Sequence, residues 1–563
     1  MNSTLVTIIC LVILLLSPPI FSQRYLGYRP TDSGGLLMPE QAAYDVTFYE
    51  LSLEVKPETR SIAGSLTVHA KVVHPLEWFV LDLDRRLGVT SVQLLNFENE
   101  PVFADFEHRN NKLWIHLNVS RQPGEAVAVR VHYHGQPKVA PAPPWVGGFT
   151  WAKTAGGQPW IATSVQLDGG DLWWPCKDHP SDEPDSMAIN ITIAKPLILA
   201  SNGVLREVID NNDGTSTFHW FVTNPINNYD VALNIAPYRI IEGTFNSVGG
   251  KEIPVAFWAL PEHFEKAKQV FPQLSEHLAF YEKYLGPYPF RNEKYGVTET
   301  PHLGMEHQTV IAYGRYRNNE FGYDELHHHE LGHEWWGNLV TAFDWRDFWL
   351  HEGFCAYMQA LYVEELHGGD AYHRFFETRR PLVRNITTLA PREPTSAMER
   401  YFVAPEFIES DGDIYTKGAL VLHALRYLIG KEDFLKSLRR FAYPSPELEK
   451  VTDGRQCRFA TTDDFLKLVE DISGKDLDWF FDVYVRQPVL PRLVTGRQGD
   501  SLQLEWEVPG DLRFPMPVEV NIENRIEKIE MPDGKATVKL DKNAEWEVDP
   551  EDWIFRHGNW KAK

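Results

Sequence analysis

The stretch His327-His-His-Glu-Leu-Gly-His-Glu-Trp-Trp-Gly337 indicates both the fold and the chemistry of this 563-residue chain. It contains a single H-E-x-x-H pattern, formed by His329, Glu330 and His333, because no other histidine in it is followed by glutamate and then by histidine at the required spacing. In a helix, residues four apart project from the same face, so both imidazoles can bind one metal ion. We therefore expect a helix here, with His329 and His333 as metal ligands.

A third ligand is expected from Glu352, which follows His333 after eighteen residues in the run Trp349-Leu-His-Glu-Gly-Phe354. Two histidines and one glutamate leave one coordination position open for water, and zinc fits this donor set without redox chemistry. Glu330 is then not a ligand but lies beside the metal, where it can take the proton from a zinc-bound water whose pKa falls to about 7. Three further histidines are expected on the helix surface or behind the ligands, not on zinc: His327, His328 and His351.

These features resemble the aminopeptidase N family of zinc metallopeptidases, a group of gluzincins, and further segments between about residues 44 and 484 agree in order. Leu303-Gly-Met-Glu-His307 resembles the family's G-x-M-E-N motif, and Tyr415-Thr-Lys-Gly418 resembles its Y-x-K-G motif. Gln166 precedes Pro175-Cys-Lys-Asp178 as a Gln or Glu does in the family. Leu303 and His307 depart from the motif, which puts the shape of the substrate pocket in doubt but removes no catalytic atom.

The resemblance implies a substrate site that holds the free amine of a peptide. Glu306 and Gln166 would bind the α-ammonium group, which fixes the distance from the N-terminus to the zinc. Gly304 would lie with its backbone along the substrate, and Met305 would line the pocket for the first side chain. The partners implied are therefore peptide substrates with a free N-terminus.

The resemblance also implies the chemistry. Tyr415 would donate a hydrogen bond to the oxyanion of the tetrahedral intermediate, and Glu330 would pass its proton to the leaving amine. The function expected is a zinc aminopeptidase with one Zn²⁺ per chain. Three alternatives stay open: a thermolysin-like zinc endopeptidase, which would need free space where Glu306 stands; a non-catalytic binding scaffold on the same fold; and an epoxide hydrolase side activity, as known among relatives.

The fold class expected is multidomain α+β. Segments of alternating apolar and polar residues between about residues 43 and 239 indicate an N-terminal antiparallel all-β domain, which we place over residues 23–245. Helical spacing then dominates over residues 246–488, where the resemblance implies a thermolysin-like, mainly helical catalytic domain. Alternation returns after that, which indicates a small C-terminal β-sandwich over residues 489–563. Larger family members carry a further helical domain above the active site; we expect a short member without it, with an open cleft and without that domain's basic residues for the substrate carboxylate.

Composition limits the compartment and the partners. The net charge of −23 argues against nucleic-acid binding, which requires clustered Lys and Arg. Residues 1–22 carry no charge and include an apolar run of about twelve residues, too short for a membrane span of roughly twenty. We interpret them as a signal peptide and expect a secreted or periplasmic protein with no transmembrane segment after signal removal; an uncleaved N-terminal anchor is the alternative.

Overall fold

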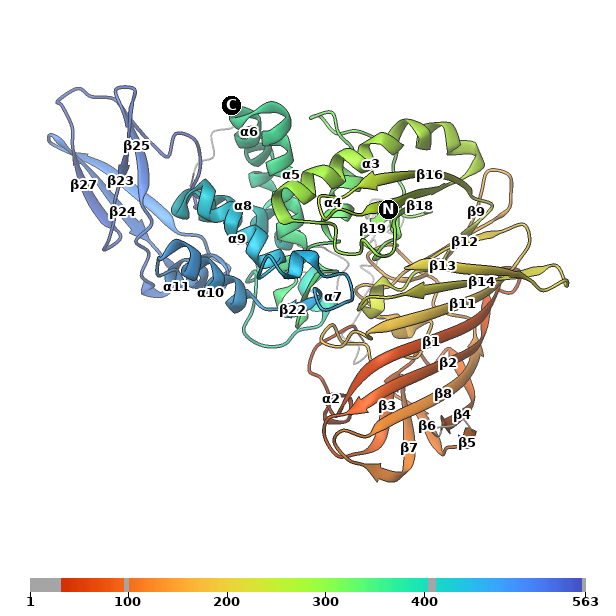
Figure 1. Cartoon of the computed structure of the whole chain (residues 1–563). Coiled ribbons are helices and arrows are strands. Elements are labelled where there is room, and N and C mark those ends of the chain that lie inside the picture. Colours follow the sequence, from red (N-terminus) through yellow and green to blue (C-terminus); the bar gives the residue numbers. More distant parts are fainter. Residues whose placement is uncertain (1–31, 96–100, 403–411, 559–563) are drawn as a thin grey trace, which may run out of the picture.

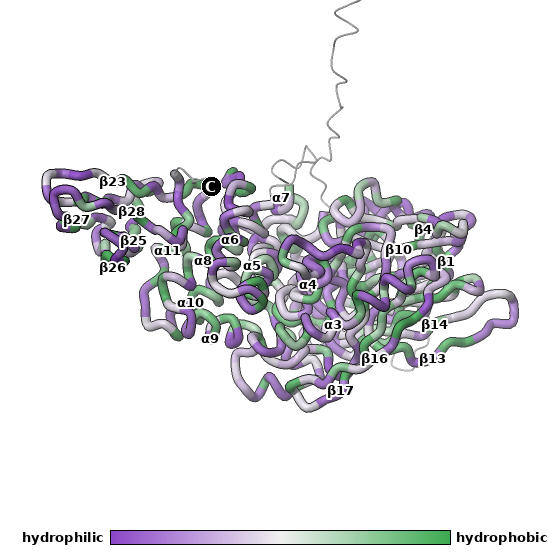
Figure 2. The backbone as a smooth tube through the Cα atoms, turned by 90° about the horizontal axis from the view of Figure 1, so that it is seen from above, coloured by the Kyte–Doolittle hydropathy of each residue, from purple (hydrophilic) through white to green (hydrophobic). Residues whose placement is uncertain are grey.

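The computed structural model describes residues 32–95, 101–402 and 412–558, and three parts follow one another along it (Figure 1). The predicted signal peptide lies outside the described residues. Within them, no helix has the length and apolar character needed to cross a membrane. Seen from above in Figure 2, the N-terminal strands, the helices and the C-terminal strands again form a row.

The N-terminal part is built on an eight-stranded sheet in the order β13-β14-β11-β1-β2-β8-β4-β5. Its strands are β1 (Tyr44–Lys56), β2 (Ser61–Val72), β4 (Leu87–Leu95), β5 (Pro101–Phe103), β8 (Ala126–Gly135), β11 (Ser186–Ala194), β13 (Val204–Asp210) and β14 (Thr215–Val222). Alternate residues along β11 are buried, as the period of two predicts. The expectation of a purely antiparallel domain is wrong at one place, because β1 pairs with β11 in parallel, with Leu51 opposite Ile189.

Two smaller sheets complete this part. One has the order β3-β7-β6, and the other the order β12-β15-β10-β9. Their strands are β3 (Leu76–Asp82), β6 (Phe106–Arg109), β7 (Lys112–Arg121), β9 (Gly148–Lys153), β10 (Pro159–Ser164), β12 (Ile198–Ala200) and β15 (Asn234–Ala236); a short helix, α2 (Pro39–Ala42), precedes β1. The chain that leaves β10 brings Gln166 and Leu167 to the cavity described below.

The middle part joins a five-stranded sheet to a group of helices. The sheet has the order β16-β17-β18-β20-β19, with parallel pairing of β17 with β18 and of β18 with β20. Its strands are β16 (Arg239–Asn246), β17 (Glu252–Ala259), β18 (Tyr295–Glu299), β19 (Gly304–Met305) and β20 (Ile311–Tyr313). The predicted boundary between residues 245 and 246 falls inside β16, whose pairing with β17 places it in this sheet.

Helices make up most of the rest of this part, as the helical spacing of the sequence predicts. They are α3 (Phe264–Leu285), α4 (Glu325–Gly332), α5 (Trp349–His367), α6 (Gly369–Arg379), α7 (Ala397–Tyr401), α8 (Asp413–Ile429), α9 (Lys431–Ala442), α10 (Thr462–Ser473) and α11 (Asp478–Tyr484). Two short strands, β21 (Val340–Ala342) and β22 (Arg458–Ala460), pair in parallel. The aromatic residues Trp335, Trp336, Trp345 and Trp349 are fully buried around α4 and α5, so these elements are held by a large apolar core.

The C-terminal part consists of two three-stranded sheets, with the orders β23-β24-β27 and β26-β25-β28. Their strands are β23 (Arg492–Gln498), β24 (Ser501–Glu507), β25 (Val518–Ile522), β26 (Arg525–Ile529), β27 (Lys535–Lys539) and β28 (Trp546–Val548). Figure 1 places them at the opposite end of the molecule from the large N-terminal sheet. Cys176, Cys355 and Cys457 are free thiols, so the described parts are stabilised by packing and not by disulfides.

Candidate active site

The helix α4 presents the two predicted histidine ligands. Asp324 caps its N-terminus by accepting a hydrogen bond from the backbone N–H of His327 at 3.0 Å. The helix ends at Gly332, before the end of the stretch for which a helix was expected, and turns then carry Trp335 onto the ring of Tyr281. His333 keeps helical backbone angles (φ −67°, ψ −19°), so it still lies one turn after His329 on the same face.

The three predicted zinc ligands meet at one point. Glu352 Oε2 lies 3.1 Å from His329 Nε2 and 3.4 Å from His333 Nε2, and the two Nε2 atoms are 3.2 Å apart. Four ligands placed tetrahedrally about 2.0–2.1 Å from zinc are roughly 3.3 Å from one another, so these separations fit a zinc ion. The Nδ1 atom of His333 is hydrogen-bonded to the carbonyl oxygen of Trp336 at 2.9 Å, which leaves Nε2 free to bind metal.

A close helix crossing places Tyr415 beside this donor set. A Cβ atom on Gly353 of α5 would lie 2.9 Å from the Cα atom of Gly418 in α8, so both positions require glycine for the two helices to approach. The crossing brings the Tyr415 hydroxyl within 2.8 Å of Glu352 Oε1, to which it donates a hydrogen bond. The second Glu352 oxygen therefore remains directed at the histidines.

The neighbouring histidines are buried. His327, His328 and His351 have no exposed surface, so the interpretation that places them on the helix surface is wrong, whereas the one that places them behind the ligands fits. His351 Nε2 accepts a hydrogen bond from the backbone N–H of Ala342 at 2.9 Å. His328 packs against Tyr281, and His327 shares a hydrogen bond with His277 at 2.7 Å. These rings hold α4 against the surrounding elements and leave metal binding to His329 and His333.

Glu306 and Gln166 form a pair at one end of the site, as the sequence suggests. Gln166 Nε2 donates a hydrogen bond to Glu306 Oε1, and the two residues are only 7% and 3% exposed. The backbone oxygen of Glu306 accepts a hydrogen bond from Asn338 Nδ2 at 3.0 Å, which holds the chain in place directly after β19. The N-terminal part and the middle part thus each supply one of the two groups.

Gly304 and Met305 occupy β19 next to this pair. A Cβ atom on Gly304 would lie 2.5 Å from Glu330 Oε1, so only glycine leaves room for that carboxylate. Met305 and Leu303 both line the cavity, so the Leu303 departure from the motif does affect its shape. His307 is fully buried and does not line it; burial, with a contribution from His302, lowers the pKa of His307 to about 3.

The carboxyl groups of the site differ in their acidity. Burial and then the charge of Glu306 raise the pKa of Glu330 well above its usual value, and burial raises the pKa of Glu306. Burial also acts to raise the pKa of Glu352, but His333 and His329 outweigh it and hold that pKa far below its usual value. Glu352 is thus an ionised ligand beside a Glu330 that binds protons more readily.

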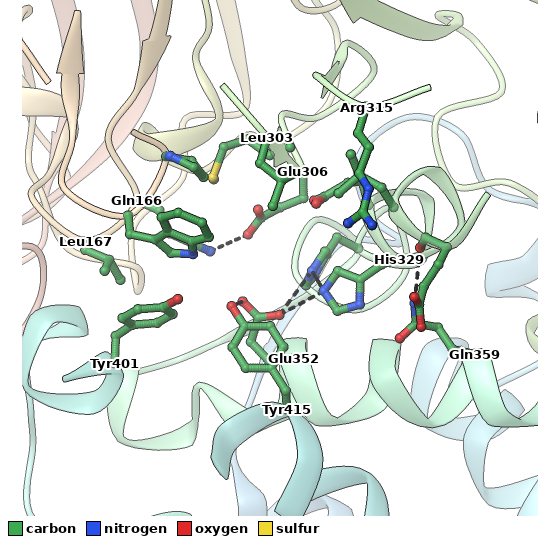
Figure 3. A pocket seen from close by; sticks show the side chains of 18 of the residues that line it. Gln166, Leu167, Leu303, Glu306, Arg315, His329, Glu352, Gln359, Tyr401 and Tyr415 are labelled. Atoms are coloured by element: carbon green, nitrogen blue, oxygen red, sulfur yellow. Dashed lines mark hydrogen bonds and ion pairs between the residues drawn. The ribbon is translucent and has the colours of Figure 1, made fainter. Parts of the chain in front are cut away.

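These residues line one cavity of about 330 Å³ (Figure 3). All nine predicted site residues contact it. In Figure 3, Gln166, Leu167 and Tyr401 lie on one side of His329 and Glu352, and Arg315 and Gln359 lie on the other. Leu167, Tyr401, Arg315 and Gln359 were not predicted, because they belong to no recognised motif and reach the cavity only through the tertiary fold.

Two family descriptions match the chain. The Peptidase M1 N-terminal domain matches residues 46–229, and the Peptidase family M1 domain matches residues 274–484, so the two cover more than half of the chain. The chain belongs to peptidase family M1. The predicted resemblance and the arrangement of an N-terminal β domain before a helical catalytic region are thereby confirmed. This family and the donor geometry agree on one zinc ion per chain as the cofactor.

Curated relatives of this family member match at low identity. Endoplasmic reticulum aminopeptidase 1 of Mus musculus is 24% identical over 63% of this chain and 41% of its own length. Leucyl aminopeptidase of Saccharolobus solfataricus is 25% identical, over 70% of this chain and 49% of its own length. Aminopeptidase N of Haemonchus contortus is 26% identical over 76% of this chain and 43% of its own length. The chain therefore spans less than half of the length of each.

Solved structures support the same fold. An M1 zinc metallopeptidase from Deinococcus radiodurans, in a mutant form bound to a Tyr-Ser-Ala substrate, superposes with a TM-score of 0.65. It is 24% identical, and the match covers 81% of this chain and 98% of that one. At this identity the similarity shows a shared fold.

Proposed function

We propose that this M1 family member is a zinc aminopeptidase, which removes the N-terminal residue from peptides that have a free N-terminus. The observation that carries the proposal is the buried Glu306, held by Gln166 at one end of the cavity that contains the zinc donor set. Zinc bound by His329, His333 and Glu352 would supply Lewis-acid polarisation of a carbonyl and activation of a water. The names of the curated relatives support the same activity.

The amine end selects the substrate. The Glu306 carboxylate pairs with the α-ammonium group, and the Gln166 side-chain oxygen can accept a further hydrogen bond from it. With the ammonium at Glu306, the first peptide carbonyl reaches the zinc ligands, since one residue spans about 3.3–3.6 Å. A longer chain on the amine side would meet Glu306 itself, which argues against the endopeptidase alternative.

Glu330 serves as the general base and then as the general acid. It lies in the cavity next to His329 and His333, with Oε1 packed against Gly304. From there it accepts a proton from the attacking water and delivers it to the leaving amine. Its presence, together with a complete donor set, argues against the non-catalytic scaffold.

Tyr415 stabilises the negative charge that develops on the carbonyl oxygen. Its hydroxyl lines the cavity and donates to Glu352 Oε1. During the reaction it would exchange this acceptor for the substrate oxygen, on which a preorganised donor has its largest effect.

The proposal extends to organisation and location. We divide the chain into a signal peptide (1–22), an N-terminal β domain (23–245), a thermolysin-like catalytic domain (246–488) and a C-terminal β-sandwich (489–563). The apolar, uncharged segment at residues 1–22 supports a secreted or periplasmic protein. The two sheets formed by β23–β28 support the sandwich.

The free-amine requirement gives a direct test. Leucine arylamide and its N-acetylated form are compared as substrates of the zinc-loaded protein, and the acetylated form should be turned over at least about a hundredfold more slowly because it cannot pair with Glu306. Glu306→Gln should narrow that difference by slowing only the free-amine substrate. Glu365→Gln, which changes a carboxylate on the exposed end of α5, is the matched control. Equal turnover of both substrates by the unaltered protein would defeat the proposal.

A further inference from the structure

The cavity continues past the zinc ligands, away from the amine end. Gln359 lines it there and donates a hydrogen bond from Nε2 to the backbone oxygen of Glu325 at 3.1 Å. Arg315 and Arg317 line the same cavity. A peptide held at Glu306 places its first carbonyl at the zinc donor set. Its second residue, whose Cα atom is 3.8 Å from the first, therefore lies past the zinc ligands in this direction. Figure 3 shows the Arg315 side chain reaching towards His329 from above, to the right of Gln166 and Glu306.

Arg315 is an available cation at that end. Its side chain comes from the chain between β20 and α4 and is half-buried. No described residue forms a hydrogen bond or ion pair with it, whereas Glu325 in the same cavity is paired with Arg379 at 2.5 Å. A guanidinium group in a partly buried cavity without a partner is suited to bind a carboxylate in a bidentate pair.

The acids that face Arg315 are otherwise engaged. Asp324 caps α4 and also accepts a hydrogen bond from the Tyr313 hydroxyl. Burial raises the pKa of Asp324 to about 6, although its hydrogen bonds and the charge of Arg315 act in the opposite direction. Glu330 Oε1 lies against Gly304. The cavity is therefore anionic at Glu306 and cationic at Arg315.

We propose that Arg315 determines specificity by pairing with a carboxylate on the leaving part of the peptide. The carboxylate belongs either to an acidic side chain on the second residue or to the C-terminus of a dipeptide. This inference rests on the proposed aminopeptidase function. The basic residue comes from the middle part of the chain, which also carries the zinc donor set.

Three peptides separate the two sources of the carboxylate. Leu-Gln-NH₂ carries none beyond the scissile bond, Leu-Glu-NH₂ carries one on the side chain, and Leu-Gln with a free C-terminus carries one at its end. The readout is kcat/KM for each, expressed relative to Leu-Gln-NH₂. Dissociation constants from calorimetry in a Glu330→Gln background give a second readout that does not depend on turnover.

Arg315→Gln should reduce the relative kcat/KM of a carboxylate-bearing peptide about tenfold, the usual effect of losing a charged hydrogen bond. Arg315→Lys should retain part of the preference and shows that a loss is not due to misfolding. The control, Arg525→Gln, removes the same charge from an exposed pair with Glu527 in the C-terminal part and should leave the ratios unchanged.

A loss confined to Leu-Glu-NH₂ assigns Arg315 to the side chain, and a loss confined to free Leu-Gln assigns it to the C-terminus. Unchanged ratios in Arg315→Gln, with all three peptides hydrolysed, would overturn this inference and leave the aminopeptidase function standing. Failure of the unaltered protein to hydrolyse any of them would instead refute the proposed function. In that case, equal dissociation constants for the three peptides would overturn the role of Arg315 as well.

Discussion

The two ends of the cavity are built differently around the same zinc donor set. At the amine end, Glu306 and Gln166 come from two parts of the chain, are deeply buried and are already hydrogen-bonded to each other. At the leaving end, Arg315 stands on a single loop, is half-buried and has no partner among the described residues. A preorganised, desolvated pair selects strictly, whereas a partly solvated cation only biases the choice. We therefore infer that the first end defines the reaction and the second ranks the substrates.

The largest effect is expected from a change between the two ends. Glu330→Gln removes the proposed general base and should reduce kcat about a thousandfold for every peptide, whatever its second residue. The ratio of kcat/KM between Leu-Glu-NH₂ and Leu-Gln-NH₂ should stay the same, because the substitution changes neither end of the cavity. Steady-state kinetics with both peptides, alongside zinc content by elemental analysis, measure this. A loss smaller than a hundredfold with zinc retained would contradict the role of Glu330.

A somewhat smaller effect is expected from Tyr415→Phe. Loss of one oxyanion donor commonly costs about a hundredfold in kcat, and the effect should again be the same for all peptides. The variant also loses the hydrogen bond to Glu352 Oε1, so zinc content must be measured with it. Thr416→Ala, at the next position of α8, provides the control. A rise in KM with an unchanged kcat would place Tyr415 in substrate binding and not in charge stabilisation.

The sequence predicted those parts of the fold that depend on local pattern. Strands in the N- and C-terminal parts and helices in the middle part were expected from periodicity, and the ligands His329, His333 and Glu352 from motif spacing. The parallel pairing of β1 with β11 was missed because pairing between distant strands leaves no periodic signal in either strand. The end of α4 at Gly332 was not predicted because it depends on tertiary packing. Tyr281 of α3 packs so closely on Gly332 that a Cβ atom there would lie 2.4 Å from the Tyr281 hydroxyl.

The candidate site divides in the same way. Residue types within motifs could be assigned from the sequence, but Arg315 lies fourteen positions before His329 in a segment without a motif, and only the fold directs it at the cavity. Burial of His327, His328 and His351 was equally hidden, since polar side chains are mostly exposed unless partners satisfy them. Those partners are far away in the sequence, as His277 is from His327, or lie in another element, as the backbone of Ala342 does.

The smallest expected effect is the coupling between the two ends. Glu306→Gln and Arg315→Gln alter groups on opposite sides of the zinc ligands, so for Leu-Gln-NH₂ their effects on the free energy of the transition state should add to within about 0.5 kcal/mol. Leu-Glu-NH₂ can contact both ends at once. If Glu306 fixes the position from which the glutamate side chain of the substrate reaches Arg315, loss of the contact with Glu306 also weakens the contact with Arg315. For this peptide alone, the double variant should then lose less transition-state free energy than the sum of the two single variants. A double-mutant cycle in kcat/KM with both peptides measures the difference. Strict additivity for Leu-Glu-NH₂ would mean that the ends act independently, and strong coupling for Leu-Gln-NH₂ would mean that Arg315 acts through the protein and not through the substrate.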